Sequence, residues 1–208
     1  VQAERLAAVG QTIAALSHHI KNIMQGVRFG SDMVRTALAD DDRGLLEKGW
    51  RLVEKNQAKI DHLMLDMLSY SKEREPLIEP TDLNALAADV LDVVRGRAAD
   101  AGVALDWTPG DLPVVPCDPD GIHRALLNVV SNAVDAAEGC DPARVAVETR
   151  AAADGFAEVA VSDTGGGIPA DKLADIFRPF VSTKGAKGTG LGLPVSRKVL
   201  REHGGDVL

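Results

Sequence analysis

The chain has 208 residues, of which 45% are hydrophobic and 3% aromatic, enough for one large domain or two small ones. Its 31 Asp and Glu residues outnumber its 23 Lys and Arg residues, and the net charge of −8 argues against a nucleic-acid partner or an anionic membrane surface. Cys117 and Cys140 lack zinc-site spacing and no apolar run approaches the roughly 18 residues of a membrane span, so we expect a cytoplasmic fragment with free thiols and no direct membrane contact.

Apolar residues recur every three or four positions through the first 75 residues, which is typical of paired helices. The first stripe has Leu6, Ile13, Ile20 and Val27 at heptad position a, and Val9, Leu16 and Ile23 at position d. A turn is predicted at Ala39–Gly44, and the second stripe follows it with Leu46, Val53, Ile60 and Met67 on one position and Leu63 and Tyr70 on the other. Since a lone hairpin cannot bury its apolar face, we predict a homodimeric four-helix bundle, with an inert coiled-coil spacer as the alternative.

A mixed α/β domain is predicted over residues 81–208, after a proline-bearing linker at 76–80. The expected helices are Asp82–Ala101, capped by Thr81 or Asp82, then Pro119–Ala137 and Val195–His203. The expected strands are Val103–Trp107, Val145–Arg150 and Ala157–Ser162, the last two joined by a turn at Asp154–Gly155. A further strand is expected to begin at Asp206, so we expect the intact domain to extend past Leu208. The full-length protein is expected to be either soluble or membrane-anchored upstream of this fragment.

His18 lies in the segment Ser-His-His-Ile-Lys-Asn, at residues 17–22. It falls at heptad position f and points away from the seam, whereas His19 falls at position g on its flank. An outward neutral imidazole is a nucleophile that can accept a phosphoryl group near neutral pH. The alternative for a single exposed histidine is a solvated surface residue without a role.

Asn128, Asn132 and Asp135 are spaced i, i+4 and i+7 along a predicted helix and therefore share one face. Amide and carboxylate oxygens there suit hydrated Mg²⁺ and its phosphate ligands, because Mg²⁺ prefers oxygen and keeps much of its water. Ordinary helix polarity is the alternative.

Two glycine-rich segments lie near the C-terminus, DTGGGI at Asp163–Ile168 and GTGLGL at Gly188–Leu193, with IFRPFVSTK between them at Ile176–Lys184. A carboxylate at a strand end can accept a hydrogen bond from the exocyclic amine of adenine, and glycines let the backbone pass close to a base. Free backbone N–H groups ahead of a helix form a phosphate cradle, beside which Lys184 and Lys187 add positive charge. The pattern matches neither a Walker A loop nor a dinucleotide fingerprint.

Taken together, these segments resemble the sensor histidine kinases of two-component systems over nearly the whole chain. Residues 1–75 are similar to the dimerisation and phosphotransfer hairpin, and the rest is similar to the Bergerat-fold ATP-binding domain, a mixed sheet covered by helices on one face. SHHIKN resembles the H box, NVVSNAVDA at Asn128–Ala136 the N box, DTGGGI the G1 box, IFRPF the F box and GTGLGL the G2 box.

The resemblance implies that His18 is the phosphoacceptor, that Asn132 ligates Mg²⁺ and that Asn128 lies near the γ-phosphate of ATP. It implies that Asp163 reads adenine and that Phe177, Pro179 and Phe180 anchor a lid from Arg178 to Lys187. The implied nucleotide-contacting residues are Asn132, Asp135, Asp163, Gly165, Gly167, Ile168, Phe180, Thr183, Lys184, Lys187, Gly188, Thr189, Gly190, Leu191 and Gly192.

Two positions depart from the family pattern. His19 stands where the family usually has the acidic general base, and Ile23 stands where it usually has proline. A neutral His19 can still take a proton, and Ile23 at position d predicts a helix without a kink. Asn22 matches the residue that, in the family, helps to dephosphorylate the partner regulator.

The predicted function is an ATP- and Mg²⁺-dependent histidine autokinase that phosphorylates His18 and passes the phosphoryl group to an aspartate of a response regulator receiver domain. One alternative is a Bergerat-fold ATPase or serine kinase in which the hairpin only dimerises. The other is a scaffold that binds nucleotide without catalysis.

Overall fold

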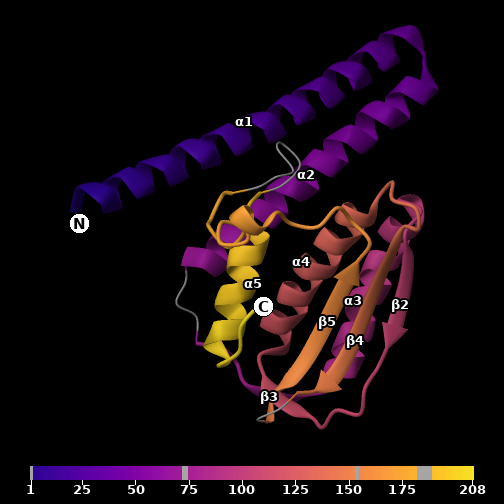
Figure 1. Cartoon of the computed structure of the whole chain (residues 1–208). Coiled ribbons are helices and arrows are strands. Elements are labelled where there is room, and N and C mark those ends of the chain that lie inside the picture. Colours follow the sequence, from indigo (N-terminus) through magenta and orange to yellow (C-terminus); the bar gives the residue numbers. More distant parts are fainter. Residues whose placement is uncertain (1, 72–74, 153–154, 182–188) are drawn as a thin grey trace. The chain divides into compact units, whose positions relative to one another are not determined.

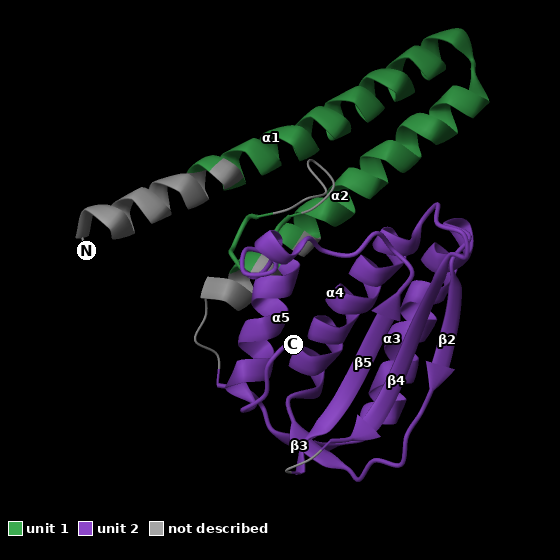
Figure 2. Ribbon diagram, in the orientation of Figure 1, with its two compact units in different colours: residues 1–72, 178–191 green, residues 73–177, 192–208 purple. Residues whose placement is uncertain are grey.

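The protein, in a computed structural model, is described over residues 2–71, 75–152, 155–181 and 189–208 (Figure 1). It divides into two compact units, the first of Val1–Lys72 with Arg178–Leu191, the second of Glu73–Phe177 with Gly192–Leu208 (Figure 2). The first unit contains the two long helices α1 (Gln2–Asp40) and α2 (Arg43–Ser71). The α+β class and the N-terminal hairpin are therefore confirmed.

The turn between α1 and α2 is shorter than predicted. Of the predicted turn Ala39–Gly44, only Asp41 and Asp42 lie outside helices. Asp41 takes a left-handed conformation with φ 54°, and the Asp42 carboxylate accepts a hydrogen bond from the Leu45 N–H at 3.0 Å. This cap lets α2 begin at Arg43 in spite of the following glycine, so the broader prediction was wrong.

The two helices of the hairpin pack through a row of residues spaced seven apart, all of them small or apolar except one asparagine. The buried residues of this row are Ile23, Gly30 and Ala37 on α1 and Gly49, Asn56 and Leu63 on α2. A Cβ built on Gly30 would lie 2.9 Å from the Gly49 carbonyl oxygen, and one built on Gly26 would lie 2.6 Å from the Asn56 amide. The glycines therefore let the two backbones approach closely.

Of the predicted d row, Ile23 is buried and Leu16 is half-buried, and the side chain of Val9 lies outside the described part of the chain. The predicted a row is more exposed. Ile20 is 45% exposed, although Val27 is half-buried. Met24 and Leu38 on α1 are exposed as well. The α1 helix passes through Ile23 without a break, as the absence of proline predicts.

The second unit contains a mixed three-stranded sheet in the order β2–β4–β5, built from Ala104–Thr108, Arg144–Ala151 and Ala157–Asp163. β2 runs parallel to β4, with Leu105 opposite Val145, and β5 runs antiparallel, with Val161 opposite Val147. The helices α3 (Leu83–Asp100) and α4 (Pro119–Ala137) cover one face of this sheet, and α5 (Gly192–Glu202) packs against α4 (Figure 1).

Local chemistry fixes the starts of α3 and α4. The Asp82 carboxylate accepts hydrogen bonds from the N–H groups of Asn84 and Ala85 at 2.9 and 3.1 Å. At α4, Asp118 caps the helix through the Gly121 N–H, and Pro119 occupies the first turn, where its missing N–H costs nothing. β4 alternates in burial, so its inward side chains, among them Val145 and Val147, are fully buried against α3 and α4.

Several elements differ from the sequence predictions. A two-stranded antiparallel ladder joins β1 (Glu79–Thr81) to β3 (Val115–Cys117), and neither three-residue strand was predicted. The helix expected at Val195 begins at Gly192, and a short 3₁₀ turn forms at Ala170–Lys172. The strand expected from Asp206 is not formed. In the predicted turn at Asp154–Gly155, Gly155 has φ 81°, whereas Asp154 lies outside the described residues.

Candidate functional site

His18 lies on the exposed surface of α1, as its heptad position predicts. Asn22, one turn further along α1, brings its Nδ2 within 3.3 Å of the His18 Nδ1. The contact fits either tautomer of the neutral ring: Nδ1 accepts from the amide Nδ2 when the ring proton is on Nε2, and it donates to the oxygen of a turned amide when the proton is on Nδ1. The H-box residues His18 and Asn22 are thus linked through Nδ1, which leaves Nε2 as the ring nitrogen outside this contact.

His19 differs from His18 in its surroundings. It is half-buried, and burial lowers its pKa from the ordinary value of 6.5, with further lowering by the charges of Lys59 and His18. A lowered pKa keeps the imidazole neutral near pH 7, when it can accept a proton. The sequence did not indicate that Lys59 affects His19, because Lys59 lies on α2, about forty residues further along the chain.

Asn128, Asn132 and Asp135 lie on α4, but their environments differ. The Asn128 Nδ2 is buried and is the one buried side-chain nitrogen or oxygen without a hydrogen-bond partner among the described residues. A Cβ built on Gly192 would lie 3.5 Å from the Asn128 Cγ, so the N-box amide packs against the first residue of α5. Asp135, by contrast, forms an ion pair with Arg97 of α3.

The predicted adenine loop follows β5 directly. Asp163 is the last residue of β5 and is exposed, and its Oδ1 accepts a hydrogen bond from the Gly165 N–H at 2.8 Å. A Cβ on Gly165 would lie 2.6 Å from the Ala136 carbonyl oxygen at the end of α4, so only glycine fits there. Gly167 has φ 69°, and Ile168 is 48% exposed. The G1-box residues therefore meet the C-terminal end of the N-box helix.

The residues on either side of 182–188 are joined to each other. The Phe180 N–H donates to the Gly190 carbonyl at 2.8 Å, and a Cβ on Gly190 would lie 2.6 Å from the Phe180 carbonyl carbon. Both residues have φ 65°, a conformation that costs glycine little but strains phenylalanine. The Thr189 hydroxyl accepts a hydrogen bond from the Leu191 N–H at 3.3 Å, just before α5 begins. The predicted contacts Thr183, Lys184, Lys187 and Gly188 lie outside the described residues.

The chemistry of this region fits an anionic ligand that carries hydrogen-bond acceptors. A buried amide donor without a partner costs about 1–3 kcal/mol unless a ligand satisfies it, and the Asn128 Nδ2 is such a donor. The start of α5 adds backbone N–H groups and the positive end of a helix dipole. No cluster of three or more His, Cys, Asp or Glu side chains forms a metal site in the described part of the chain, so a cation would need amide oxygens and ligand oxygens.

Sequence reasoning missed the residues that hold these segments together. Arg197 stacks on Phe177 and pairs with Asp206, and Arg97 pairs with Asp135. None of these contacts has a local signature, because their partners are nine to 38 positions away along the chain.

Comparison with known proteins agrees with this geometry. Residues 117–208 match the family described as histidine kinase-, DNA gyrase B- and HSP90-like ATPases. The sensor histidine kinase ZraS of Escherichia coli (strain K12) is 30% identical over 98% of this chain and 43% of its own length. The chain spans less than half the length of the curated relatives ZraS and AtoS that it matches. None of the described helices is long and apolar enough to cross a membrane.

Solved structures extend the likeness. The mycobacterial sensor histidine kinase MprB is 32% identical, with a TM-score of 0.54 over 62% of this chain and 81% of that one. Full-length ShkA, solved in complex with AMPPNP, is 26% identical, with a TM-score of 0.66 over 93% of this chain and 41% of that one. The described hairpin and sheet unit both have counterparts in such structures.

Proposed function

Because the chain belongs to the sensor histidine kinases, we propose that it is the ATP-dependent autokinase core of a two-component signalling system, with His18 as the phosphoacceptor. The observation that carries this proposal is the exposed imidazole of His18, tied to Asn22, in a chain whose other unit matches an ATPase family. Residues 76–80 are proposed as the linker on which the ATP-binding domain moves, with Glu79 and Pro80 paired in β1.

The nucleotide is proposed to lie along α4 and the start of α5. Asn128 donates its unpartnered amide to a phosphate oxygen, and Asn132 supplies an amide oxygen to Mg²⁺. Asp163 recognises the adenine amine, with its carboxylate oriented by the Gly165 N–H. ATP would supply the phosphoryl group and Mg²⁺ would neutralise its charge. The remaining proposed contacts are Asp135, Gly167, Ile168, Phe180, Thr183, Lys184, Lys187, Gly188, Thr189, Gly190, Leu191 and Gly192.

The chemistry at His18 requires one proton transfer. A ring nitrogen attacks phosphorus only through a free lone pair, so attack through Nε2 requires the ring proton to be on Nδ1, the nitrogen that lies beside Asn22. Nδ1 must give up that proton as Nε2 bonds to phosphorus and ADP leaves. We assign His19 as the general base because its lowered pKa keeps it neutral and able to take that proton. Proton transfer of this kind contributes about 10²–10⁴-fold to a rate.

The proposed partners are a second copy of the chain and the receiver domain of a response regulator. On α1, Ile20, Met24 and Leu38 are exposed, and on α2 so are Trp50, Met64 and Met67. A homodimer that closes a four-helix bundle would cover apolar surface of this kind. The phosphoryl group would then pass from His18 to a receiver aspartate, and Asn22 is proposed to act in the reverse, dephosphorylating reaction.

The test is autophosphorylation with γ-labelled ATP. We expect a phosphoprotein that is labile in acid and stable in base, which the His18→Gln variant loses and the His19→Gln variant retains at a reduced rate. Label that survives in His18→Gln would refute the assignment of the acceptor. A chain that binds nucleotide but takes no label would instead act as a scaffold.

A further inference from the structure

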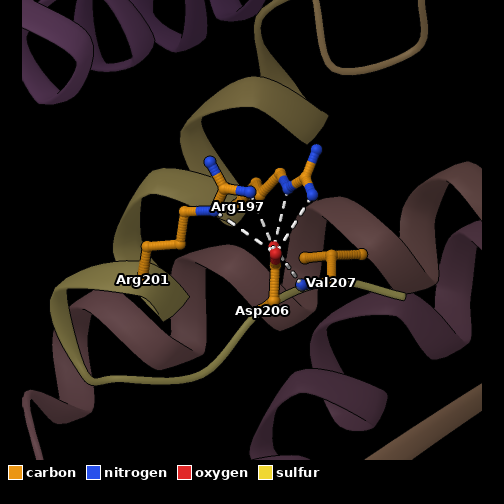
Figure 3. A network of polar contacts seen from close by, with 4 residues as sticks. All are labelled: Arg197, Arg201, Asp206 and Val207. Carbon is orange, nitrogen blue, oxygen red and sulfur yellow. Dashed lines mark hydrogen bonds and ion pairs between the residues drawn. The ribbon is translucent and has the colours of Figure 1, made fainter. Parts of the chain in front are cut away.

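Arg197, on α5, contacts two segments at once, the ring of Phe177 and the carboxylate of Asp206. Figure 3 shows its contact with Asp206. Its guanidinium carbon lies 4.3 Å from the centroid of the Phe177 ring. Its Nε and one terminal nitrogen donate to the two oxygens of Asp206 at 2.6 and 3.0 Å. The guanidinium therefore bonds the carboxylate through two N–H donors while its carbon lies over the ring, a combination that a lysine ammonium cannot reproduce.

We propose that Arg197 is a positioning residue that fixes Phe177 to α5 and thereby sets the place from which the segment Arg178–Leu191 departs. Phe177 is the residue directly before that segment, whose far end returns to α5 at Gly192. The inference rests on the proposed nucleotide site, because it adds to that site a residue that contacts no nucleotide.

Asp206 holds the guanidinium in its stacking orientation. Besides Arg197, Arg201 donates to the Asp206 Oδ2 at 3.0 and 3.3 Å, and the Val207 N–H donates to Oδ1 at 2.8 Å. These hydrogen bonds, first those from Arg197, hold the pKa of the Asp206 carboxyl well below its usual range. The carboxylate thus stays charged at any pH at which the protein would work.

The position of α5 is itself fixed against α4. The buried Ser196 hydroxyl lies 3.2 Å from the Ala125 carbonyl of α4 and 2.9 Å from the Gly192 carbonyl of its own helix. Gly192 packs against Asn128 on the same two helices. Arg197 therefore ties Phe177 to the pair of helices that carries the proposed phosphate site.

The test compares Arg197→Gln with Arg201→Gln in the whole chain. Both variants lose a hydrogen bond to Asp206, but only the first loses the contact with Phe177, so Arg201→Gln is the matched control. Calorimetric titration with AMPPNP is expected to show affinity about fivefold weaker in Arg197→Gln and within about twofold of the parent in Arg201→Gln. Arg197→Lys, which keeps the charge but not the stacked plane, is expected to fall between them.

A second readout does not depend on nucleotide. Hydrogen–deuterium exchange of the apo protein should be faster at the Phe180 N–H, which bonds to the Gly190 carbonyl, in Arg197→Gln but not in Arg201→Gln. Phe177→Leu should match Arg197→Gln, and the double variant should be no worse than either single one. Equal exchange in the two arginine variants, or additive effects in the double variant, would overturn the inference. A parent chain that fails to bind AMPPNP would refute the proposed nucleotide site, while the exchange experiment would still decide the role of Arg197.

Discussion

The Gly30→Ala substitution in the hairpin should destabilise the protein, although alanine is the better helix former. Gly30 lies within α1 and is buried against α2. A Cβ there would lie 2.9 Å from the Gly49 carbonyl oxygen and 2.9 Å from the Val53 Cγ2. The backbone oxygen cannot rotate away, so the helices must separate by about 0.6 Å to reach ordinary contact distances of roughly 3.5 Å.

The expected magnitude follows from two opposing terms. Replacing glycine by alanine inside a helix stabilises it by about 0.8–1 kcal/mol. Overpacking a tight contact costs about 1–3 kcal/mol. Both contacts of a Cβ at Gly30 are much shorter than normal contact distances, so we expect a cost in the upper half of that range. The net loss of stability is then about 1–2 kcal/mol per chain. In a unit of this size, that loss lowers the melting temperature by about 4–16 °C.

The assay uses the two tryptophans of the chain, which report on different units. Trp50 lies on α2 and Trp107 in β2, so Trp107→Phe leaves a fluorophore in the hairpin alone. Thermal unfolding followed at Trp50 gives the effect of Gly30→Ala. The control is Gly44→Ala, in the same unit, where the nearest contact of a new Cβ is an ordinary 3.4 Å to the Asp42 carboxylate.

Gly44→Ala should leave the hairpin midpoint unchanged or raise it slightly. A rise in midpoint for Gly30→Ala of the same size as for Gly44→Ala would refute the reasoning. It would mean that the glycine row does not hold the two backbones close together, and that helix propensity alone decides the effect of an added methyl group.

Three further predictions concern single side chains. Since the pKa of His19 is lowered in the folded protein, stability is complete above the unfolded pKa of about 6.5 and falls as the pH drops toward the folded value; urea unfolding at pH 7.5 and 5.5 should show this loss, and His19→Gln should reduce it. Thr149→Val should lower the free energy of unfolding by about 1–3 kcal/mol, because the buried hydroxyl donates to the Asn84 Oδ1 and accepts from the Gly110 N–H. Thr149→Ser should keep both hydrogen bonds, and urea unfolding followed by Trp107 fluorescence distinguishes the two variants. Asn128→Leu should leave the melting temperature equal or higher, because it removes an unpartnered buried donor, while weakening AMPPNP binding at least about tenfold; a variant that melts lower and binds normally would contradict the proposed role of Asn128.

Periodicity predicted the long elements well, since it records which side of a helix or strand is buried. The helix Pro119–Ala137 was predicted to the residue, because Asp118 and Pro119 mark its start chemically. The strands β1 and β3, at three residues each, are too short to show an alternating pattern. They form because they pair with each other, although about thirty-five residues separate them. A short stretch of sequence around either strand therefore does not contain its partner.

The candidate site was predictable to the extent that its residues come in contiguous motifs. Asn128 and Asp163 were found from their neighbours, and the structure adds that Asn128 packs against Gly192. The ion pairs between these segments could not be predicted, because the sequence around a charged residue does not indicate which distant residue will pair with it. Asp135 illustrates the limit: its spacing from Asn128 and Asn132 made it a proposed ligand, but Arg97 also pairs with it. A ligand would therefore have to compete with, or share, that ion pair.

The glycines of the hairpin show how a pattern of apolar residues can hide a contact. In the stripe on α1, Gly30 looks like a gap between Ile23 and Ala37, yet all three are buried at one heptad position. The position is small because the opposing residue, Gly49, brings its backbone to that point. A glycine seven residues from two buried positions in a helical stripe therefore indicates a close approach of backbones rather than an interruption. Gly96 on α3 is not such a position, because a Cβ built on it meets no atom within 4 Å.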